Sequence, residues 1–226
     1  MLRRLQERQP GSPIYRILWW YLYHALTFYW FVPCYRYRSW GGRNIPDTGP
    51  VLLLSNHQSF LDPIIVGLGG HKRQFHPLAR KTLWDSALYR ALTVPMNPIP
   101  VDQENEAGDI KAMKACIEQL KNDQAVLVYP EGSRSDDGAT GEFQPGTMLL
   151  IKRAKPTVIP VALEGSFDAW PKERKLPKLR GRIGCMYGDP IRSEDLLAMG
   201  NDAAIRHLRN TVEAMRLELR ERLDRL

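Results

Sequence analysis

Beyond residue 44 the chain alternates short, continuously apolar runs with segments of helical periodicity. We predict strands at Val51–Ser55, Phe75–Ala79, Ile99–Asp102, Ala125–Tyr129, Val158–Leu163 and Ile183–Tyr187. These runs lack the apolar–polar alternation of a sheet with one face in water, so we expect both faces to be covered. The pattern predicts an α/β fold: a single domain with a mostly buried mixed sheet flanked by helices.

Two segments have an apolar stripe at helical spacing. One, near residues 109–122, places Ile110, Met113, Ile117 and Leu120 on one face. The other, residues 201–226, aligns Ile205, Leu208, Val212, Met215 and Leu219, and its opposite face is dense in Arg and Glu. A one-sided stripe predicts an amphipathic C-terminal helix docked on the domain, with contact to a membrane as the lesser alternative.

The N-terminal segment has a different pattern. Residues 14–40 hold twelve of the chain's 21 aromatic residues, and no formal charge occurs from Ile17 to Tyr35. Trp and Tyr prefer the headgroup boundary of a membrane. We therefore interpret residues 1–40 as a basic aromatic helix, or a helix pair broken near Pro33, that lies in the membrane interface. The alternatives are a helix that spans the membrane and a helix packed on the core. We do not expect a signal peptide, because no cleavage site of small residues follows an apolar region.

Charge narrows the choice of partner. The formal net charge is +7, and residues 1–40 hold six arginines against one acid, Glu7. A basic surplus beside the most apolar segment favours an anionic membrane surface, and no nucleic-acid recognition motif is present. We expect three parts: the membrane-associating segment 1–40, an α/β domain over 41–200, and the C-terminal helix 201–226.

The three cysteines are far apart in the sequence, at Cys34, Cys116 and Cys185. The sequence contains no CxxC pair and no cluster of His and Cys, so we expect packed free thiols and no metal site.

The stretch "LLLSNHQSFLDP" places His57 directly after a predicted strand and Asp62 five residues later. Open α/β sheets bind ligands at the carboxyl ends of their strands. A carboxylate bound to one ring nitrogen would fix the tautomer of the histidine, which leaves the other nitrogen to take a proton. The alternative is structural: Ser59 and Asp62 resemble a helix capping box, with His57 as a loop residue.

The stretch "VLVYPEGSRS" ends a second predicted strand with a turn that presents Glu131, Gly132, Ser133 and Arg134. The planar guanidinium of Arg134 suits phosphate, and Gly132 permits a close approach of the backbone. The alternative is a surface turn with a solvated arginine.

In order and spacing, these stretches resemble the glycerophospholipid acyltransferase family, the 1-acyl-sn-glycerol-3-phosphate acyltransferase type. The resemblance covers about residues 40–190. Its motifs match Asn56, His57 and Asp62; Pro130, Glu131, Gly132, Ser133, Arg134 and Ser135; and Val158, Ile159, Pro160 and Val161. "ARKTLWDS" places Arg80 where the family commonly has lysine, and "PIPVDQEN" places Gln103 where it commonly has arginine.

The resemblance implies that an acyl group passes from an acyl thioester, on coenzyme A or acyl-carrier protein, to the hydroxyl of a lysolipid. His57 would be the base and Asp62 would orient it. The acceptor headgroup would contact the 131–134 turn, Arg80 and Gln103. Neither a cofactor nor a metal is implied, and the enzyme would work on the cytoplasmic face of a membrane.

The first choice of acceptor is 1-acylglycerol-3-phosphate, which would give phosphatidic acid. Because Gln103 is neutral, another lysophospholipid or a lyso-aminolipid remains open as the acceptor. A transacylase on the same scaffold, or a non-catalytic lipid-binding protein, would also be compatible with these motifs.

Overall fold

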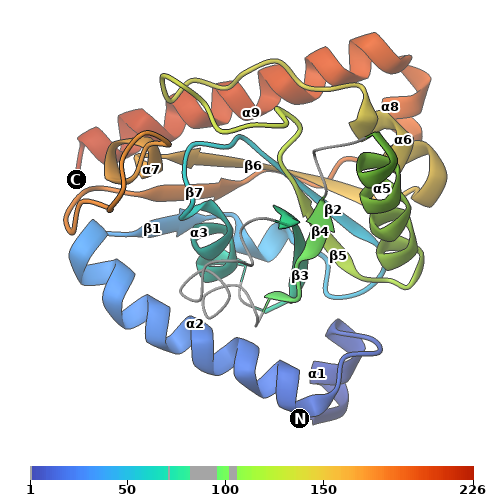
Figure 1. Cartoon of the computed structure of the whole chain (residues 1–226), viewed down its shortest axis with the longest axis horizontal. Coiled ribbons are helices and arrows are strands. Elements are labelled where there is room, and N and C mark those ends of the chain that lie inside the picture. Colours follow the sequence, from blue (N-terminus) through green and yellow to red (C-terminus); the bar gives the residue numbers. More distant parts are fainter. Residues whose placement is uncertain (1, 71, 82–95, 102–105) are drawn as a thin grey trace.

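The computed structural model describes residues 2–70, 72–81, 96–101 and 106–226. Within these ranges, seven strands form one sheet in the order β1-β7-β6-β2-β5-β3-β4 (Figure 1). Their bounds are β1 (Arg38–Trp40), β2 (Val51–Ser55), β3 (Phe75–Arg80), β4 (Ile99–Val101), β5 (Ala125–Val128), β6 (Thr157–Glu164) and β7 (Gly184–Tyr187).

The sheet is mixed, as predicted. Strands β6, β2, β5, β3 and β4 run parallel, whereas β7 is antiparallel to β6 and pairs in parallel with β1. The six predicted strands are present with ends that differ by at most one residue, apart from Asp102, which lies outside the described residues. The short strand β1 was not predicted.

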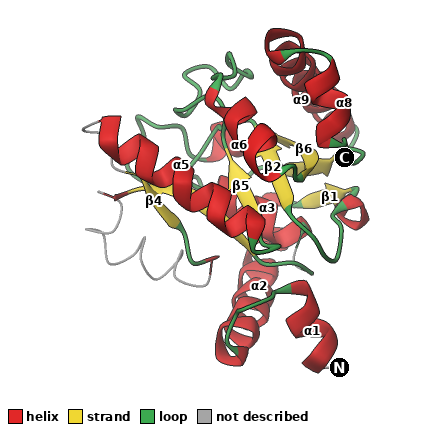
Figure 2. Ribbon diagram, turned by 90° about the vertical axis from the view of Figure 1, so that its right-hand side faces the viewer, coloured by secondary structure: helices red, strands yellow, loops and turns green. Residues whose placement is uncertain are grey.

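Helices cover both faces of the sheet, which explains why the strand sequences are continuously apolar. The helices are α1 (Leu2–Arg8), α2 (Ile14–Tyr35), α3 (Asp62–Gly69), α5 (Glu106–Lys121), α6 (Gly146–Ala154), α7 (Ser166–Ala169), α8 (Ser193–Ala198) and α9 (Asn201–Asp224), with a 3-10 turn η1 (Gly42–Asn44). Leu53 packs in one core cluster with α2 and α3, whereas the next residue, Leu54, packs in a second cluster with α5, α6, α8 and α9. Figure 2 shows the sheet from the side, enclosed by these helices.

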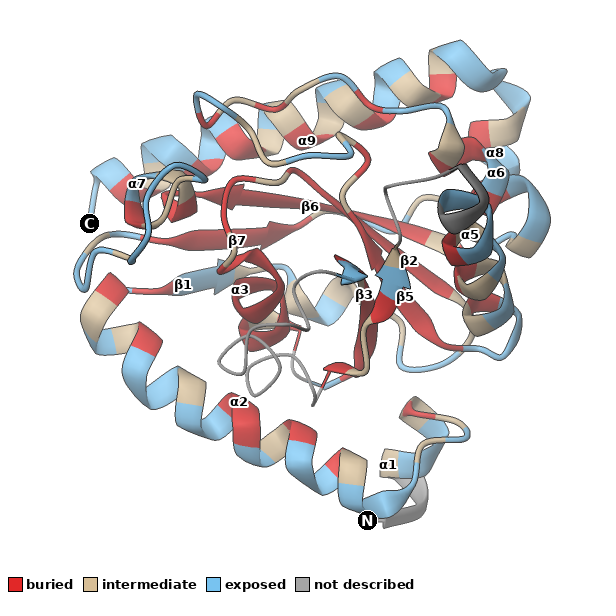
Figure 3. Cartoon of the chain, in the orientation of Figure 1, coloured by how far each residue is buried: buried red, intermediate tan, exposed pale blue. Residues whose placement is uncertain are grey.

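Helix α2 is continuous, with Pro33 in its last turn, so of the two alternatives for this segment the single helix is confirmed and the break near Pro33 is wrong. One face belongs to the core through Ile17, Trp20, Tyr23, Phe31 and Tyr35. The opposite face exposes large apolar side chains: Tyr15, Leu18, Trp19, Leu22, Leu26, Phe28, Tyr29 and Trp30. In Figure 3 exposed positions, drawn in pale blue, recur along α2. The helix therefore packs on the domain and also presents an apolar surface outward. Among the described helices, none combines the length and the apolarity that crossing a bilayer requires.

Helix α9 docks on the sheet, as predicted for the C-terminal stripe. Leu208, Val212 and Leu219 are fully buried. The same face also buries a charged residue, Arg216, whose side chain is only 4% exposed. The apolar stripe therefore contains a cation that must be paired within the fold.

Candidate active site

The turn that carries His57 begins at a fixed point on the sheet, because Asn56 extends the pairing of β2 with β6. The buried Asn56 side chain donates from Nδ2 to the Leu163 carbonyl oxygen (3.0 Å) and accepts at Oδ1 from the Leu163 N–H (2.8 Å). The amide thus replaces a rung of the backbone ladder. The chain can then leave the sheet at His57, and the backbone groups of Leu163 keep their hydrogen-bond partners.

His57 and Asp62 are hydrogen-bonded to one another. His57 Nδ1 lies 2.8 Å from Asp62 Oδ2; the histidine side chain is 20% exposed and the aspartate side chain is fully buried. A carboxylate can only accept, so Nδ1 carries the hydrogen, and in the neutral ring Nε2 holds the lone pair. This pair can remove a proton from a hydroxyl that approaches Nε2.

Asp62 also holds the turn itself. Oδ2 accepts from the backbone N–H groups of Gln58 (2.7 Å) and Ser59 (2.8 Å). The capping-box alternative is therefore half correct: the carboxylate reaches back to the Ser59 N–H, but α3 begins at Asp62 and its N-cap residue, Leu61, makes no side-chain cap. One carboxylate thus performs the structural and the orienting task together.

Two residues that the sequence did not indicate complete the surroundings of the pair. Ser166, at the start of α7, donates from Oγ to Asp62 Oδ1 (2.7 Å). The ring of Tyr129 stacks on the His57 imidazole, with ring centroids 3.9 Å apart and planes inclined by 14°. Ser166 lies just beyond the carboxyl end of β6 and Tyr129 beyond that of β5, the two strands that flank β2. The signal that could have found them is this strand order.

The predicted phosphate turn clamps the backbone of His57 from both sides. The His57 N–H donates to Glu131 Oε1 (2.9 Å), and the Ser135 N–H donates to the His57 carbonyl oxygen (2.7 Å). The other oxygen of Glu131, Oε2, accepts from the Gly141 N–H (3.1 Å). Burial raises the pKa of Glu131 to about 7. The described bonds of Glu131 are all to backbone groups, and its contact with an acceptor headgroup stays a prediction.

Arg134 lies over the ring of Phe60, with its guanidinium carbon 3.6 Å from the ring centroid. Phe60 belongs to the His57–Asp62 turn, so this cation–π contact brings the arginine beside the pair. Gly132 has a φ of +77°, a conformation that L side chains rarely adopt, and Ser133 is exposed at the tip of the turn. The geometry thus places the cation and the turn at the edge that carries His57.

Arg80 ends β3 at the same edge of the sheet and is exposed. Leu53 of β2 and Pro77 of β3 both pair with Leu127 of β5, so these two residues lie at the same height in the sheet. His57 and Arg80 each follow them by a few residues, toward the carboxyl ends of the strands. No described hydrogen bond or ion pair joins Arg80 to His57. Gln103 lies outside the described residues.

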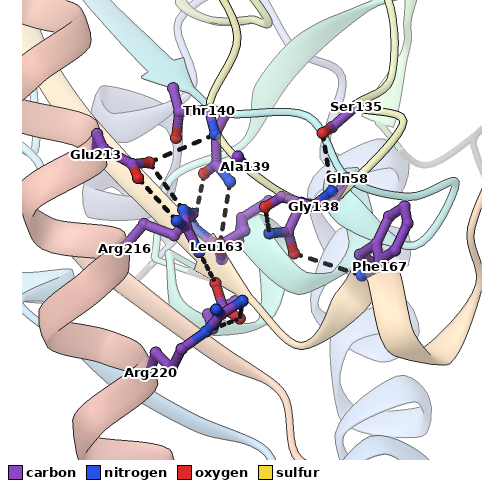
Figure 4. Close-up of polar contacts among 12 residues, drawn as sticks. Gln58, Ser135, Gly138, Ala139, Thr140, Leu163, Phe167, Glu213, Arg216 and Arg220 are labelled. Atoms are coloured by element: carbon purple, nitrogen blue, oxygen red, sulfur yellow. Dashed lines mark hydrogen bonds and ion pairs between the residues drawn. The ribbon is translucent and has the colours of Figure 1, made fainter.

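Helix α9 supports the site from outside through buried ion pairs. Arg216 donates to Glu164 Oε2 and to Glu213 Oε1, each at 2.7 Å. Burial opposes the ionisation of Glu213, but hydrogen bonds from Arg216 and Thr140 lower its pKa to about 2. Figure 4 shows Glu213 and Arg216 beside Thr140, whose N–H donates to Glu213 Oε2 (3.4 Å). The loop next to Gly141, and through it Glu131, is thereby tied to α9.

The fold and the site together define a class of protein: an α/β protein with a hydrogen-bonded histidine–aspartate pair and an arginine-bearing turn at the carboxyl edge of its sheet. A family model described as "Acyltransferase" matches residues 36–164, which is more than half of the chain. The chain therefore belongs to this acyltransferase family.

Curated relatives carry names within this family. A chloroplastic 1-acyl-sn-glycerol-3-phosphate acyltransferase of Arabidopsis thaliana is 26% identical over 173 residues, which cover 76% of this chain and 48% of that protein. The enzyme of the same name from Bacillus subtilis is 22% identical over 183 residues, covering 81% of this chain and 87% of that protein. The chain thus spans about half the length of the plant relative and most of the bacterial one.

Among solved structures, the chain is similar to the crystal structure of the 1-acyl-sn-glycerophosphate acyltransferase PlsC from Thermotoga maritima. The TM-score is 0.75 at 20% identity, over 96% of this chain and 87% of that one. This likeness confirms the predicted fold class.

Proposed function

We propose that the chain transfers a fatty acyl group from an acyl thioester to the free hydroxyl of a lysolipid, with 1-acylglycerol-3-phosphate as the first acceptor. The observation that carries this proposal is the bond between His57 Nδ1 and Asp62 Oδ2, at 2.8 Å. It lies beside the turn that holds Arg134. A base next to a cation suits an acceptor that bears both a hydroxyl and a phosphate. The names of the relatives agree with this acceptor.

In the proposed reaction, Nε2 of His57 takes the proton of the acceptor hydroxyl as its oxygen bonds to the thioester carbonyl carbon. The carbon–sulfur bond then breaks, and the thiolate leaves with a proton returned by the imidazolium. Asp62 stabilises the imidazolium while it exists. Acyl transfer is direct, with no acyl-enzyme; the thioester is the second substrate, and the residues that act require no metal or cofactor.

Positive charge supports the choice of a phosphorylated acceptor. Arg134 can donate two parallel hydrogen bonds to phosphate, and Arg80 adds a second cation at the same edge. The hydroxyl of Ser133 can complete the contact as a hydrogen-bond donor, whereas the Gly132 N–H already donates to the Tyr129 carbonyl oxygen (3.1 Å) and shapes the turn. Gln103 in place of a cation keeps a less anionic lysolipid as the second candidate acceptor.

The exposed face of α2 supports a place at the membrane. Tyr29 is 79% exposed, Tyr15 65% and Leu26 60%. Burying such side chains in the headgroup boundary gains hydrophobic free energy, and aromatic rings favour that depth. We propose that α2 lies in the interface on the cytoplasmic face, where the acceptor and the product also reside.

The test is an assay with purified protein and vesicles that contain one lyso-acceptor at a time. The panel comprises 1-acylglycerol-3-phosphate, zwitterionic lysophospholipids and a lyso-aminolipid, each with and without acyl-CoA or acyl-carrier protein. We expect the highest kcat/KM for 1-acylglycerol-3-phosphate and no product without thioester. Product formed without thioester would instead indicate a transacylase, and no product under any condition would indicate a lipid-binding protein.

A further inference from the structure

The segment that joins α7 to β7 carries dense positive charge. Residues 171–182 read PKERKLPKLRGR, which is six cations against one acid. All six cations are exposed, and so are Leu176 (72%) and Leu179 (65%). Lys172 pairs with Asp136. Within the described residues, the other five cations have no carboxylate at ion-pair distance. The segment therefore presents uncompensated charge together with two bare leucines.

Backbone hydrogen bonds hold this segment against the end of α2. The Gly181 N–H donates to the Cys34 carbonyl oxygen (3.2 Å), and the Tyr35 hydroxyl donates to the Lys178 carbonyl oxygen (2.6 Å). Cys34 and Tyr35 are the last two residues of α2. Figure 1 shows the orange segment beside that end of the blue helix. The basic surface is thus continuous with the helix whose outer face is apolar.

The segment also begins next to the candidate active site. The hydroxyl of Ser59, in the turn between His57 and Asp62, donates to the Trp170 carbonyl oxygen (2.8 Å). The Lys178 N–H in turn donates to the Ala169 carbonyl oxygen (2.8 Å). A partner that binds residues 171–182 would therefore lie close to the edge of the sheet that carries His57.

We propose that residues 171–182 are a second membrane contact, which places cations on anionic headgroups and Leu176 and Leu179 in the interface. The inference rests on the proposed function, in which α2 is the first contact. A single helix in the interface can roll about its own axis, whereas a second contact at its end fixes that roll. The two contacts together hold the catalytic edge toward the lipid.

An acidic protein, such as an acyl-carrier protein, is the competing partner for a basic surface. Two observations favour lipid. The exposed leucines alternate with cations, a pattern suited to a surface whose charged headgroups overlie an apolar layer. The segment is also bonded to α2, which already offers an apolar face. A carrier protein would need the charge but not that continuity.

The test compares the partition of three variants onto vesicles by flotation, a measurement that does not depend on activity. Lys175→Gln/Lys178→Gln/Arg180→Gln removes three charges from the segment. Lys111→Gln/Lys114→Gln/Lys121→Gln is the matched control, since these lysines are exposed on α5, which packs on the opposite face of the sheet from α2. Leu176→Ser/Leu179→Ser removes the apolar part. The vesicles are phosphatidylcholine alone or phosphatidylcholine with phosphatidylglycerol.

A cation near an anionic membrane contributes about fivefold in partition, so the segment's charge variant should bind the anionic vesicles about 100-fold less than the wild type. The α5 control should bind like the wild type, and the leucine variant should bind both kinds of vesicle less. Amides in 174–182 should gain protection from hydrogen exchange on anionic vesicles. Partition equal to that of the α5 control, with no added protection, would overturn the proposal.

A rise in KM for acyl-carrier protein with unchanged partition would assign the segment to the carrier instead and would also overturn it. A separate variant, Leu22→Ser/Leu26→Ser, tests the first contact, which is the exposed face of α2, by the same vesicle partition. If that variant keeps full vesicle binding, it is the proposed interfacial role of α2 that fails.

Discussion

Asp62→Asn isolates the charge of the carboxylate from its role in holding the turn. Asp62 Oδ2 accepts three hydrogen bonds, from the N–H groups of Gln58 and Ser59 and from His57, and Oδ1 accepts one from Ser166. An asparagine can place its single oxygen where Oδ2 lies and its NH₂ toward the Ser166 oxygen, which can accept. The variant should therefore fold with the His57 bond retained, and only the negative charge is lost.

The distance sets the size of the effect. With 2.8 Å between His57 Nδ1 and Asp62 Oδ2, the centres of the two charges lie about 4 Å apart. Their attraction at that separation is about 4 kcal/mol for an effective dielectric constant near 20. This attraction exists only when the imidazole has taken the proton. Because each ~1.4 kcal/mol corresponds to tenfold in rate, kcat and kcat/KM should fall together by about 10³-fold.

The assay is initial-rate formation of phosphatidic acid from 1-acylglycerol-3-phosphate and acyl-CoA on vesicles, with circular dichroism and thermal unfolding as checks of the fold. Ser166→Ala is the companion variant, because it removes one bond to the carboxylate but leaves the charge. It should lose less activity than Asp62→Asn, because the charge and the three hydrogen bonds to Oδ2 remain. A folded Asp62→Asn protein whose kcat stays within about tenfold of the wild type would refute the role assigned to the charge.

The remaining predictions concern the 131–134 turn, the C-terminal helix α9 and the acceptor. Arg134→Ala should lower kcat/KM for the phosphorylated acceptor by roughly 10- to 150-fold and change KM for the thioester less; equal losses would make Arg134 structural. The pKa of Glu131 is about 7 in the folded chain and near 4.5 ordinarily, so the folded state holds the proton more tightly, and the free energy of unfolding should fall as pH rises through that window. Urea unfolding of Glu131→Gln at pH 5 and pH 7.5 should show a smaller difference than the wild type, and an unchanged difference would assign the titration elsewhere. Arg216→Ala should lower the free energy of unfolding by up to about 3–5 kcal/mol, because it leaves the buried Glu164 with only the exposed Arg220 as a described ion-pair partner, whereas Arg222→Ala, which breaks an exposed pair with Glu218, should cost about 1 kcal/mol or less. Gln103→Arg should shift relative kcat/KM toward 1-acylglycerol-3-phosphate across the acceptor panel, and unchanged ratios would show that Gln103 does not read the headgroup.

The strands of this fold were readable because the sheet is covered on both faces. β2 is buried at every residue, which leaves a continuous apolar run in the sequence. β1 was not predicted because it has only three residues, two of them exposed, and because it pairs with β7, which is distant in the sequence. The burial of Arg216 was not predicted for a related reason. A charged residue in an amphipathic helix is expected to face solvent unless its ion-pair partner on another element, here Glu164, is known.

For the candidate site, motif spacing predicted which residues of one turn lie together, but not which residues of different turns do. His57 and Asp62 belong to one turn, so five residues of spacing sufficed to bring them together. Ser166 lies 104 residues from Asp62, and only the placement of β6 next to β2 brings it near. The same holds for Glu131: its sequence position suggested a ligand contact, whereas the structure joins its carboxylate to two backbone N–H groups.

The most direct test of the central claim is the turnover of His57→Ala on vesicles that contain 1-acylglycerol-3-phosphate and an acyl thioester, with both released thiol and phosphatidic acid measured. We expect a loss of at least ~10²–10⁴-fold in kcat for both products, while vesicle binding and thermal unfolding match the wild type. A folded, membrane-bound His57→Ala protein that keeps near-wild-type turnover would contradict the assignment of His57 as the base.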